Sequence, residues 1–131
     1  MDLKYHTTDP SKIEPDAFES EELKKIDMPE EIVMRHRSPH FGHVFSGEGY
    51  AAAYYGYMWA EVLTADAAEA FMEAPGGFYD KEVGERLVKY LFSVRNAMDP
   101  GEAYRKFRGR DAKVDALMRD RGFPIPSDSD Q

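Results

Sequence analysis

The chain has 131 residues and 25 acidic against 17 basic side chains, so its formal net charge is −8 at pH 7. This length is that of one domain or of a piece of a larger one. An acidic balance argues against nucleic-acid binding, which needs clustered lysine and arginine. No apolar run approaches the roughly 20 residues that span a bilayer, no signal-peptide pattern opens the chain, and cysteine is absent. We therefore expect a cytoplasmic protein with no nucleic-acid and no membrane partner.

Helical patterns without a convincing period-two strand predict an all-α fold of about five helices with short connections. Residues 1–12 are polar and contain Asp9-Pro10, which predicts a turn. The first predicted helix covers residues 15–26, where Pro15 suits the first turn and two lysines close the last one. Residues 27–42, which contain two prolines, predict an extended connection.

The clearest helical pattern is a long central, tyrosine-rich helix over residues 50–74. It is rich in alanine, lacks proline and is stopped by a Pro-Gly-Gly sequence. Three shorter helices follow, over residues 80–92, 100–109 and 111–122, with Asp80, Asp99 and Asp111 as their expected N-terminal caps. Residues 124–131 predict a loose tail.

The segment from His43 to Trp59 concentrates hydroxyl-bearing rings in a short stretch. On a helix, Tyr50, Tyr54 and Tyr57 would share one face, because they are spaced at i, i+4 and i+7. This pattern is typical of aromatic packing in a core helix. However, each buried hydroxyl needs a hydrogen-bond partner, so the same face beside His43 could hold a polar ligand such as a peptide backbone. Phenols placed in this way can stabilise an oxyanion in acyl transfer.

Three histidines, His36, His40 and His43, are spaced as metal ligands on one helix would be. Pro39 opposes that helix, because it disfavours helical geometry at the residue before it. No fourth ligand lies close in the sequence. We therefore interpret the stretch as a polar loop and predict no metal site in this chain.

Ser46 precedes a Gly-Glu-Gly sequence that superficially resembles a phosphate-binding loop. A Walker lysine and a preceding strand are both missing, so a phosphate site is not predicted. A serine nucleophile is not predicted either, because the nucleophile-elbow pattern is absent. The glycines fit a sharp turn or a close backbone approach instead.

Arginines and acidic residues alternate near the C-terminus. The arginines are Arg105, Arg108, Arg110, Arg119 and Arg121. Mixed signs of charge predict a solvated, salt-bridged face rather than a binding patch.

These motifs together resemble the C-terminal end of the zinc metallopeptidase family that contains thimet oligopeptidase and bacterial peptidyl-dipeptidase (dipeptidyl carboxypeptidase). Residues 35–47 are similar to the family's approach to its substrate site, and residues 49–62 to its aromatic helix. Residues 107–110, 115–117 and 121–123 are similar to its closing signature. The subgroup looks closer to the peptidyl-dipeptidases than to the eukaryotic oligopeptidases.

The resemblance implies that residues 1–131 are the C-terminal part of a helical zinc peptidase catalytic domain. A helix and an extended connection would occupy residues 1–42, a helical core with the substrate-site helix residues 43–123, and a loose tail residues 124–131.

The resemblance also implies roles for three residues. Tyr57 would hydrogen-bond the developing oxyanion, and His43 and Tyr50 would help hold the backbone of a peptide substrate. The family binds zinc through His-Glu-x-x-His, which this chain lacks. The zinc-bearing N-terminal portion would therefore be a missing partner, and the chain alone is predicted to bind no zinc and to be inactive.

Two other interpretations stay open from the sequence. A standalone helical module could bind a peptide or a protein through the tyrosine face without catalysis. A split enzyme could be completed by a second chain that carries the zinc motif. A piece of a larger enzyme should expose apolar surface and self-associate, whereas a module should be monomeric.

Overall fold

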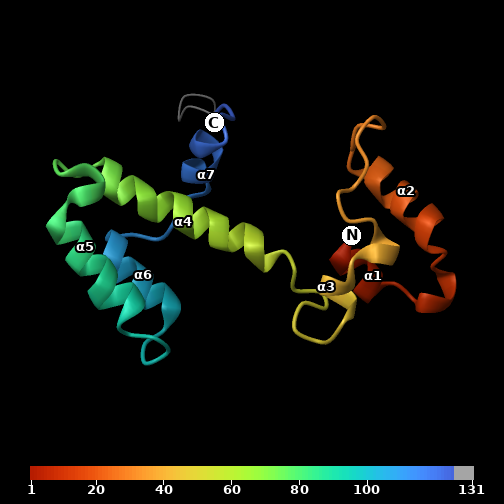
Figure 1. Ribbon diagram of the computed structural model, residues 1–131, viewed down its shortest axis with the longest axis horizontal. Helices are drawn as coiled ribbons and strands as arrows, with labels where there is room; N and C mark the ends of the chain where they lie inside the picture. The colour runs from red at the N-terminus through yellow and green to blue at the C-terminus, as the bar shows by residue number, and fades with distance from the viewer. Residues whose placement is uncertain (126–131) are drawn as a thin grey trace. The chain divides into compact units, whose positions relative to one another are not determined.

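The computed structural model describes residues 1–125, and the chain divides into two compact units, Met1–Tyr57 and Met58–Gln131. The described residues form seven α-helices and no strand, which confirms the all-α prediction (Figure 1). No helix among them is long and apolar enough to cross a membrane. Most of the predicted tail, residues 126–131, lies outside the described part of the chain.

Unit 1 is built from short helices. They are α1 (Asp2–Thr7), η1 (Pro10–Lys12), α2 (Pro15–Lys25), η2 (Ser38–His40) and α3 (Gly42–Phe45). The helix predicted over residues 15–26 is confirmed as α2. The turn predicted at Asp9-Pro10 is present as η1, and α1 precedes it. The prediction of an extended connection over residues 27–42 was wrong at η2.

Tyr5 explains why the short, polar helix α1 forms. Its ring packs against Phe18 of α2 and Phe45 of α3, with centroids 5.0 and 5.7 Å away. Its hydroxyl donates to the carbonyl oxygen of Pro15 at 3.1 Å. Six residues are too few to form a stable helix alone, so α1 depends on these contacts.

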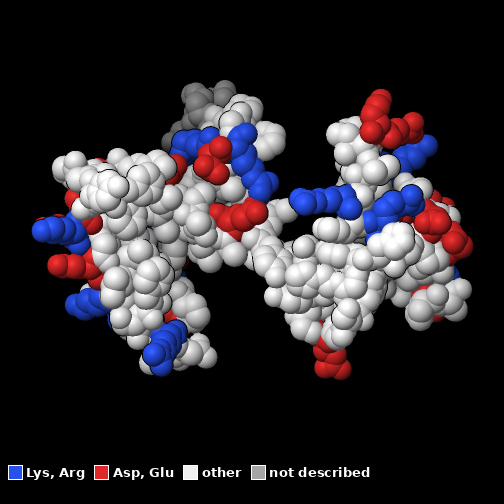
Figure 2. All heavy atoms as spheres, in the orientation of Figure 1, with Lys and Arg blue, Asp and Glu red and all other residues white. Residues whose placement is uncertain are grey.

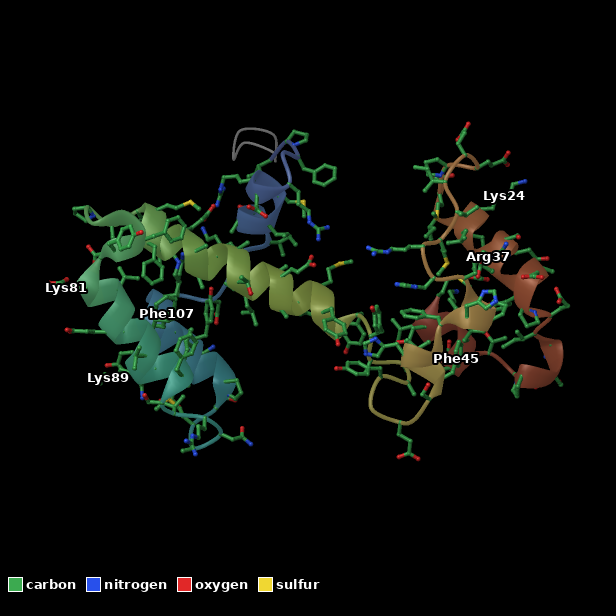
Figure 3. The ribbon with its side chains drawn as sticks, in the orientation of Figure 1. Lys24, Arg37, Phe45, Lys81, Lys89 and Phe107 are labelled. Atoms are coloured by element: carbon green, nitrogen blue, oxygen red, sulfur yellow. The ribbon has the colours of Figure 1, made fainter. Side chains whose placement is uncertain are left out.

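The buried carboxylate of Glu19 fixes the connection that follows α2. One of its oxygens accepts both the backbone N–H and the hydroxyl of Ser38, each at 2.7 Å, and the other accepts Nε of Arg37 at 2.8 Å. Figure 3 shows Arg37 beside α2. Burial raises the pKa of Glu19, but these hydrogen bonds outweigh it and leave the pKa lowered. A charged acceptor thus holds η2 in place.

Unit 2 contains the main hydrophobic core. Its helices are α4 (Gly56–Met72, which begins in unit 1), α5 (Lys81–Leu87), α6 (Pro100–Arg108) and α7 (Val114–Asp120), and α5 continues into one π-helical turn, η4 (Val88–Phe92). Ala70 of α4, Val83 of α5 and Phe107 of α6 meet in the core (Figure 3). The predicted helices over 80–92 and 100–109 are confirmed.

Two of the three predicted caps are confirmed. The carboxylate of Asp80 accepts the N–H of Val83 at 3.0 Å, and that of Asp99 accepts the N–H of Glu102 at 2.8 Å. The prediction for Asp111 was wrong, because α7 begins only at Val114. Asp111 pairs instead with Arg105 at 2.9 Å, so an ion pair has replaced the cap.

The arginine-rich C-terminal part forms the predicted salt-bridged face. Arg119 makes two hydrogen bonds to Glu69 of α4 at 2.6 and 2.8 Å, and Arg121 pairs with Glu61 of the same helix. Figure 2 shows positive and negative side chains side by side where α7 lies against α4. Exposed pairs of this kind contribute little stability each, but they specify where α7 docks.

Replacing a glycine by alanine is expected to have opposite effects on stability at two positions of unit 2. Gly84 lies inside α5, and a Cβ built there meets nothing within 4 Å, so Gly84→Ala should raise the free energy of unfolding by about 0.5–1 kcal/mol. Gly109 ends α6 at φ 82°, so Gly109→Ala should lower it by about 1 kcal/mol. Urea unfolding of both variants measures the difference, and a stabilised Gly109→Ala would contradict the assignment of this helix end.

Candidate functional site

The tyrosine-rich segment begins as a series of turns and not as the predicted helix. The helix predicted from residue 50 starts at Gly56, so the prediction was wrong for residues 50–55. Two backbone hydrogen bonds, each between residues three positions apart, shape this stretch. The N–H of Ala53 donates to the carbonyl oxygen of Tyr50, and the N–H of Gly56 donates to that of Ala53, both at 3.0 Å. Ala52 has a φ of 58°, in the left-handed region, which breaks the helical path.

Asp2 at the start of α1 supplies the physical reason for this departure. One oxygen of its carboxylate accepts the backbone N–H of Ala52, and the other accepts that of Tyr54, both at 2.9 Å. Hydrogen bonds to a charged acceptor are stronger than those between neutral groups. A tertiary contact has therefore overridden the helix propensity of the alanines.

The turn gathers four rings into one cluster, which we call the His–Tyr cluster: His43, Tyr50, Tyr54 and Tyr57. The His43 centroid lies 4.5, 5.3 and 6.0 Å from those of Tyr50, Tyr54 and Tyr57, each time edge to face. Tyr50 and Tyr57 stack at 5.4 Å. The structure thus brings together all three residues that the sequence singled out for the site.

The hydroxyls of Tyr57 and Tyr50 are joined, with Tyr57 donating to Tyr50 at 2.9 Å. Both side chains remain accessible, since Tyr57 is 45% and Tyr50 38% exposed. The hydrogen bond with Tyr50, helped by desolvation, raises the pKa of Tyr57. Its hydroxyl therefore keeps its proton at neutral pH and can act as a donor to an oxygen atom of a ligand.

Other rings of the segment lie outside the cluster. Tyr55 and Trp59 are 54% and 58% exposed. His36 stacks on Phe41 at 5.2 Å, and Phe41 in turn contacts Tyr54 edge to face at 4.9 Å. Ring packing is therefore sufficient to explain the positions of His36 and Phe41.

Sequence reasoning placed Tyr54 on one face with Tyr50 and Tyr57 but assigned it no role, and it missed Asp2. Tyr54 lies within 6.1 Å of each of the other three rings, so it is a full member of the cluster. Its spacing from Tyr50 and Tyr57 was a usable signal. Asp2 offered no such signal, because nothing in the sequence links residue 2 to a turn 50 residues later.

Comparison with known proteins identifies the family of the chain. The model of peptidase family M3 matches residues 1–123, which include every residue of the His–Tyr cluster. The chain belongs to peptidase family M3.

Relatives in the M3 family include two kinds of bacterial peptidase. Oligopeptidase A of Haemophilus influenzae is 42% identical over 88 residues, which are 66% of this chain and 12% of that protein. Dipeptidyl carboxypeptidase of Escherichia coli is 33% identical over 129 residues, which are 95% of this chain and 18% of that protein. The M3 chain described here therefore spans less than a fifth of the length of these relatives.

M3 peptidases are zinc-dependent. Among the described residues of this chain, no three or more His, Asp or Glu side chains are grouped so that they could hold a metal ion. The roles proposed below for residues of this chain are confined to hydrogen bonding and ring contacts.

Proposed function

We propose that this chain is the C-terminal part of a zinc metallopeptidase and supplies the side chains that bind the substrate and stabilise the oxyanion during peptide-bond hydrolysis. The observation that carries the proposal is the hydrogen-bonded Tyr57–Tyr50 pair, packed against His43 and exposed in a chain of family M3. Tyr57 is the oxyanion donor, and Tyr50 and His43 hold the backbone of the substrate.

The hydroxyl pair suits Tyr57 to this task because a hydroxyl proton can rotate. Without substrate, Tyr57 donates to Tyr50 at 2.9 Å. When the peptide carbonyl oxygen gains negative charge, the proton of Tyr57 turns toward it, and Tyr50 donates to the oxygen of Tyr57. Linked hydroxyls polarise each other, so the proton that Tyr57 offers is a stronger donor than that of an isolated phenol.

His43 and Tyr50 are placed to hold the substrate backbone. Their rings contact edge to face at 4.5 Å, so each restricts the orientation of the other. A histidine ring and a phenol together offer both donors and acceptors, which are the groups that a peptide backbone requires. Rigid placement of this kind lowers the entropy lost when substrate binds.

The proposal assigns zinc binding and the activation of water to residues outside this chain. Residues elsewhere in the whole enzyme bind zinc and supply the base that activates water, so the 131-residue chain alone is inactive. The whole enzyme acts on peptides, in the manner of an oligopeptidase or a peptidyl-dipeptidase. A cytoplasmic location is supported by a relative named "Probable cytosolic oligopeptidase A" from Arabidopsis thaliana, 42% identical over 87 residues.

The size of the native polypeptide tests the proposal most directly. In an extract of the source cell, an antibody against this segment should detect a band several times larger than 15.0 kDa, because the chain covers only 12% of a relative such as oligopeptidase A. A band at 15.0 kDa alone would contradict the proposal. The segment would then be a standalone binding module or one half of a split enzyme.

An apolar hollow in unit 2 supports a piece of a larger enzyme over a standalone module. Its volume is about 720 Å³, and its lining includes Phe71, Phe78, Leu91 and Phe92. Phe78 and Phe92 are each more than 60% exposed. Contiguous apolar surface of this kind drives association, so the isolated chain should self-associate at micromolar concentration in size-exclusion chromatography with light scattering.

A further inference from the structure

We propose that Asp2 is a positioning residue for the Tyr50–Tyr57 pair. Its carboxylate bridges the backbone amides of Ala52 and Tyr54 and thereby sets the turn that brings the two phenols together. The effect on catalysis rests on the function proposed above, whereas the effect on the turn does not.

The geometry of the carboxylate is suited to clamping this turn. Each of its two oxygens accepts one N–H at 2.9 Å, and the two amides are two residues apart in the chain. The side chain of Asp2 is only 10% exposed, so water competes weakly for these hydrogen bonds. A side chain with a single acceptor oxygen would have to share that oxygen between the two amides.

The backbone at Ala52 needs such a clamp. Its φ of 58° lies in the left-handed region, which residues other than glycine disfavour. The residue therefore keeps this conformation only when surrounding contacts impose it. The two hydrogen bonds of Asp2 lie on either side of the peptide units that carry this strain, and Tyr50 and Tyr57 flank the same turn.

Contacts within unit 1 hold Asp2 where it can act. Asp2 opens α1, and Tyr5 of the same helix packs on Phe45, two residues beyond His43. Figure 3 shows Phe45 on α3, beside α1. His6 adds a second support, since its Nδ1 lies 2.8 Å from a carboxylate oxygen of Asp2. Helix α1 thus ties the turn to the helix that carries His43.

Hydrogen exchange of the 131-residue chain tests the clamp without any activity assay. In Asp2→Asn, exchange at the amides of Ala52 and Tyr54, measured by NMR, should accelerate about tenfold, because a charged acceptor is lost and an NH₂ group faces one N–H. Asp9→Asn is the matched control, since Asp9 also accepts a backbone N–H but contacts only Ser11. Unchanged exchange in Asp2→Asn would overturn the proposal.

A rescue variant guards against a general loss of folding. Ala52→Gly removes the steric cost of the positive φ, so in the Asp2→Asn background it should restore the contact between the rings of Tyr50 and Tyr57. Nuclear Overhauser effects between the two rings report this contact. A Tyr50–Tyr57 contact that persists in Asp2→Asn alone would overturn the positioning role.

Activity of the intact enzyme separates the two proposals. Asp2→Asn should lower kcat about tenfold, in line with the loss of a charged hydrogen bond, and Ala52→Gly should recover part of it. If Tyr57→Phe lowers kcat but Asp2→Asn does not, the positioning role fails while the proposed function stands. If exchange accelerates in Asp2→Asn but neither variant lowers kcat, the proposed function fails and the clamp on the turn stands.

Discussion

Replacing Tyr57 by phenylalanine in the intact enzyme is expected to lower kcat roughly 100-fold or more, the usual cost of losing one oxyanion donor. The substitution removes one oxygen and keeps the ring, so the stacking on Tyr50, the edge-to-face contact with His43 and the tilted contact with Tyr54 are retained. Charge on the carbonyl oxygen develops only in the transition state. KM should therefore change much less than kcat.

Two tyrosines provide the comparison for this result. Tyr55→Phe should leave kcat unchanged, because Tyr55 is 54% exposed and lies outside the His–Tyr cluster. Tyr50→Phe should cost less than Tyr57→Phe, about tenfold, because it removes the partner of the donor and not the donor. Steady-state kinetics on a chromogenic peptide measures all three.

Unchanged turnover in Tyr57→Phe would remove its assigned role. Where the cell makes the segment alone, the same variants can be compared in Escherichia coli dipeptidyl carboxypeptidase after its 129 aligned residues are replaced by those of this chain. Circular dichroism and the unfolding midpoint of each variant would show whether a lower kcat reflects local chemistry or a general loss of folding.

Local signals were sufficient for the helices α5 and α6. Asp80 and Asp99 cap their first turns, and Gly109 ends α6 with a positive φ, as each residue type predicts on its own. The inward residues Ala103, Tyr104 and Phe107 are buried, in agreement with their helical spacing. Elements that depend on interactions within a few residues are therefore readable from the sequence.

Elements that depend on contacts with distant residues could not be predicted from the sequence. The alanines before Gly56 favour a helix, yet the carboxylate of Asp2 accepts the backbone N–H groups of Ala52 and Tyr54 and holds this stretch in a turn. Helix α1 has a polar sequence and forms through the contacts of Tyr5 with Phe18 and Phe45. Both departures come from contacts between segments that lie far apart in the chain, which periodicity does not reveal.

The site was predicted for a reason different from the one that the structure provides. Tyr50, Tyr54 and Tyr57 were expected to share a helix face, but only Tyr57 belongs to the helix. Their clustering comes from the turn, and it leaves the hydroxyls of Tyr50 and Tyr57 hydrogen-bonded to each other. Residue types therefore indicated which rings would lie together, while the geometry of their contacts required the tertiary structure.

Replacing Asp66 by alanine is expected to lower the free energy of unfolding of unit 2 by about 3–5 kcal/mol, the cost of breaking a buried ion pair. Asp66 lies on α4 and is fully buried. It accepts the hydroxyl of Tyr104 at 2.7 Å and lies 3.3 Å from Nε of Arg108 and 2.8 Å from Nη2 of Arg110. The Arg108 side chain is only 8% exposed, so the substitution would remove the acceptor of its Nε in a poorly hydrated place, while Glu73 would still accept from its Nη1 and Nη2.

Asp111→Ala is the matched control, because Asp111 also pairs with an arginine, Arg105, but is 78% exposed. Its cost should stay below about 1 kcal/mol, since water screens an exposed pair. Urea unfolding of the 131-residue chain, followed by circular dichroism, measures both variants. Equal effects of the two substitutions would contradict the assignment of Asp66 as the buried charge that joins α4 to α6.

The dependence of stability on pH provides an independent test of the contacts of Asp66. Burial raises the pKa of Asp66, but hydrogen bonds from Arg110 and Tyr104 outweigh it and leave the pKa lowered. A carboxyl group with a lowered pKa in the folded state stabilises the protein above its unfolded pKa of about 3.9, and this contribution is lost as the pH falls toward the folded value. The stability difference between the wild-type chain and Asp66→Asn should therefore be largest near neutral pH and should shrink below about pH 4. A difference that stays constant down to pH 2 would show that Asp66 acts through packing and not through its charge, because a carboxyl group with the same pKa in the folded and unfolded states makes no pH-dependent contribution to stability.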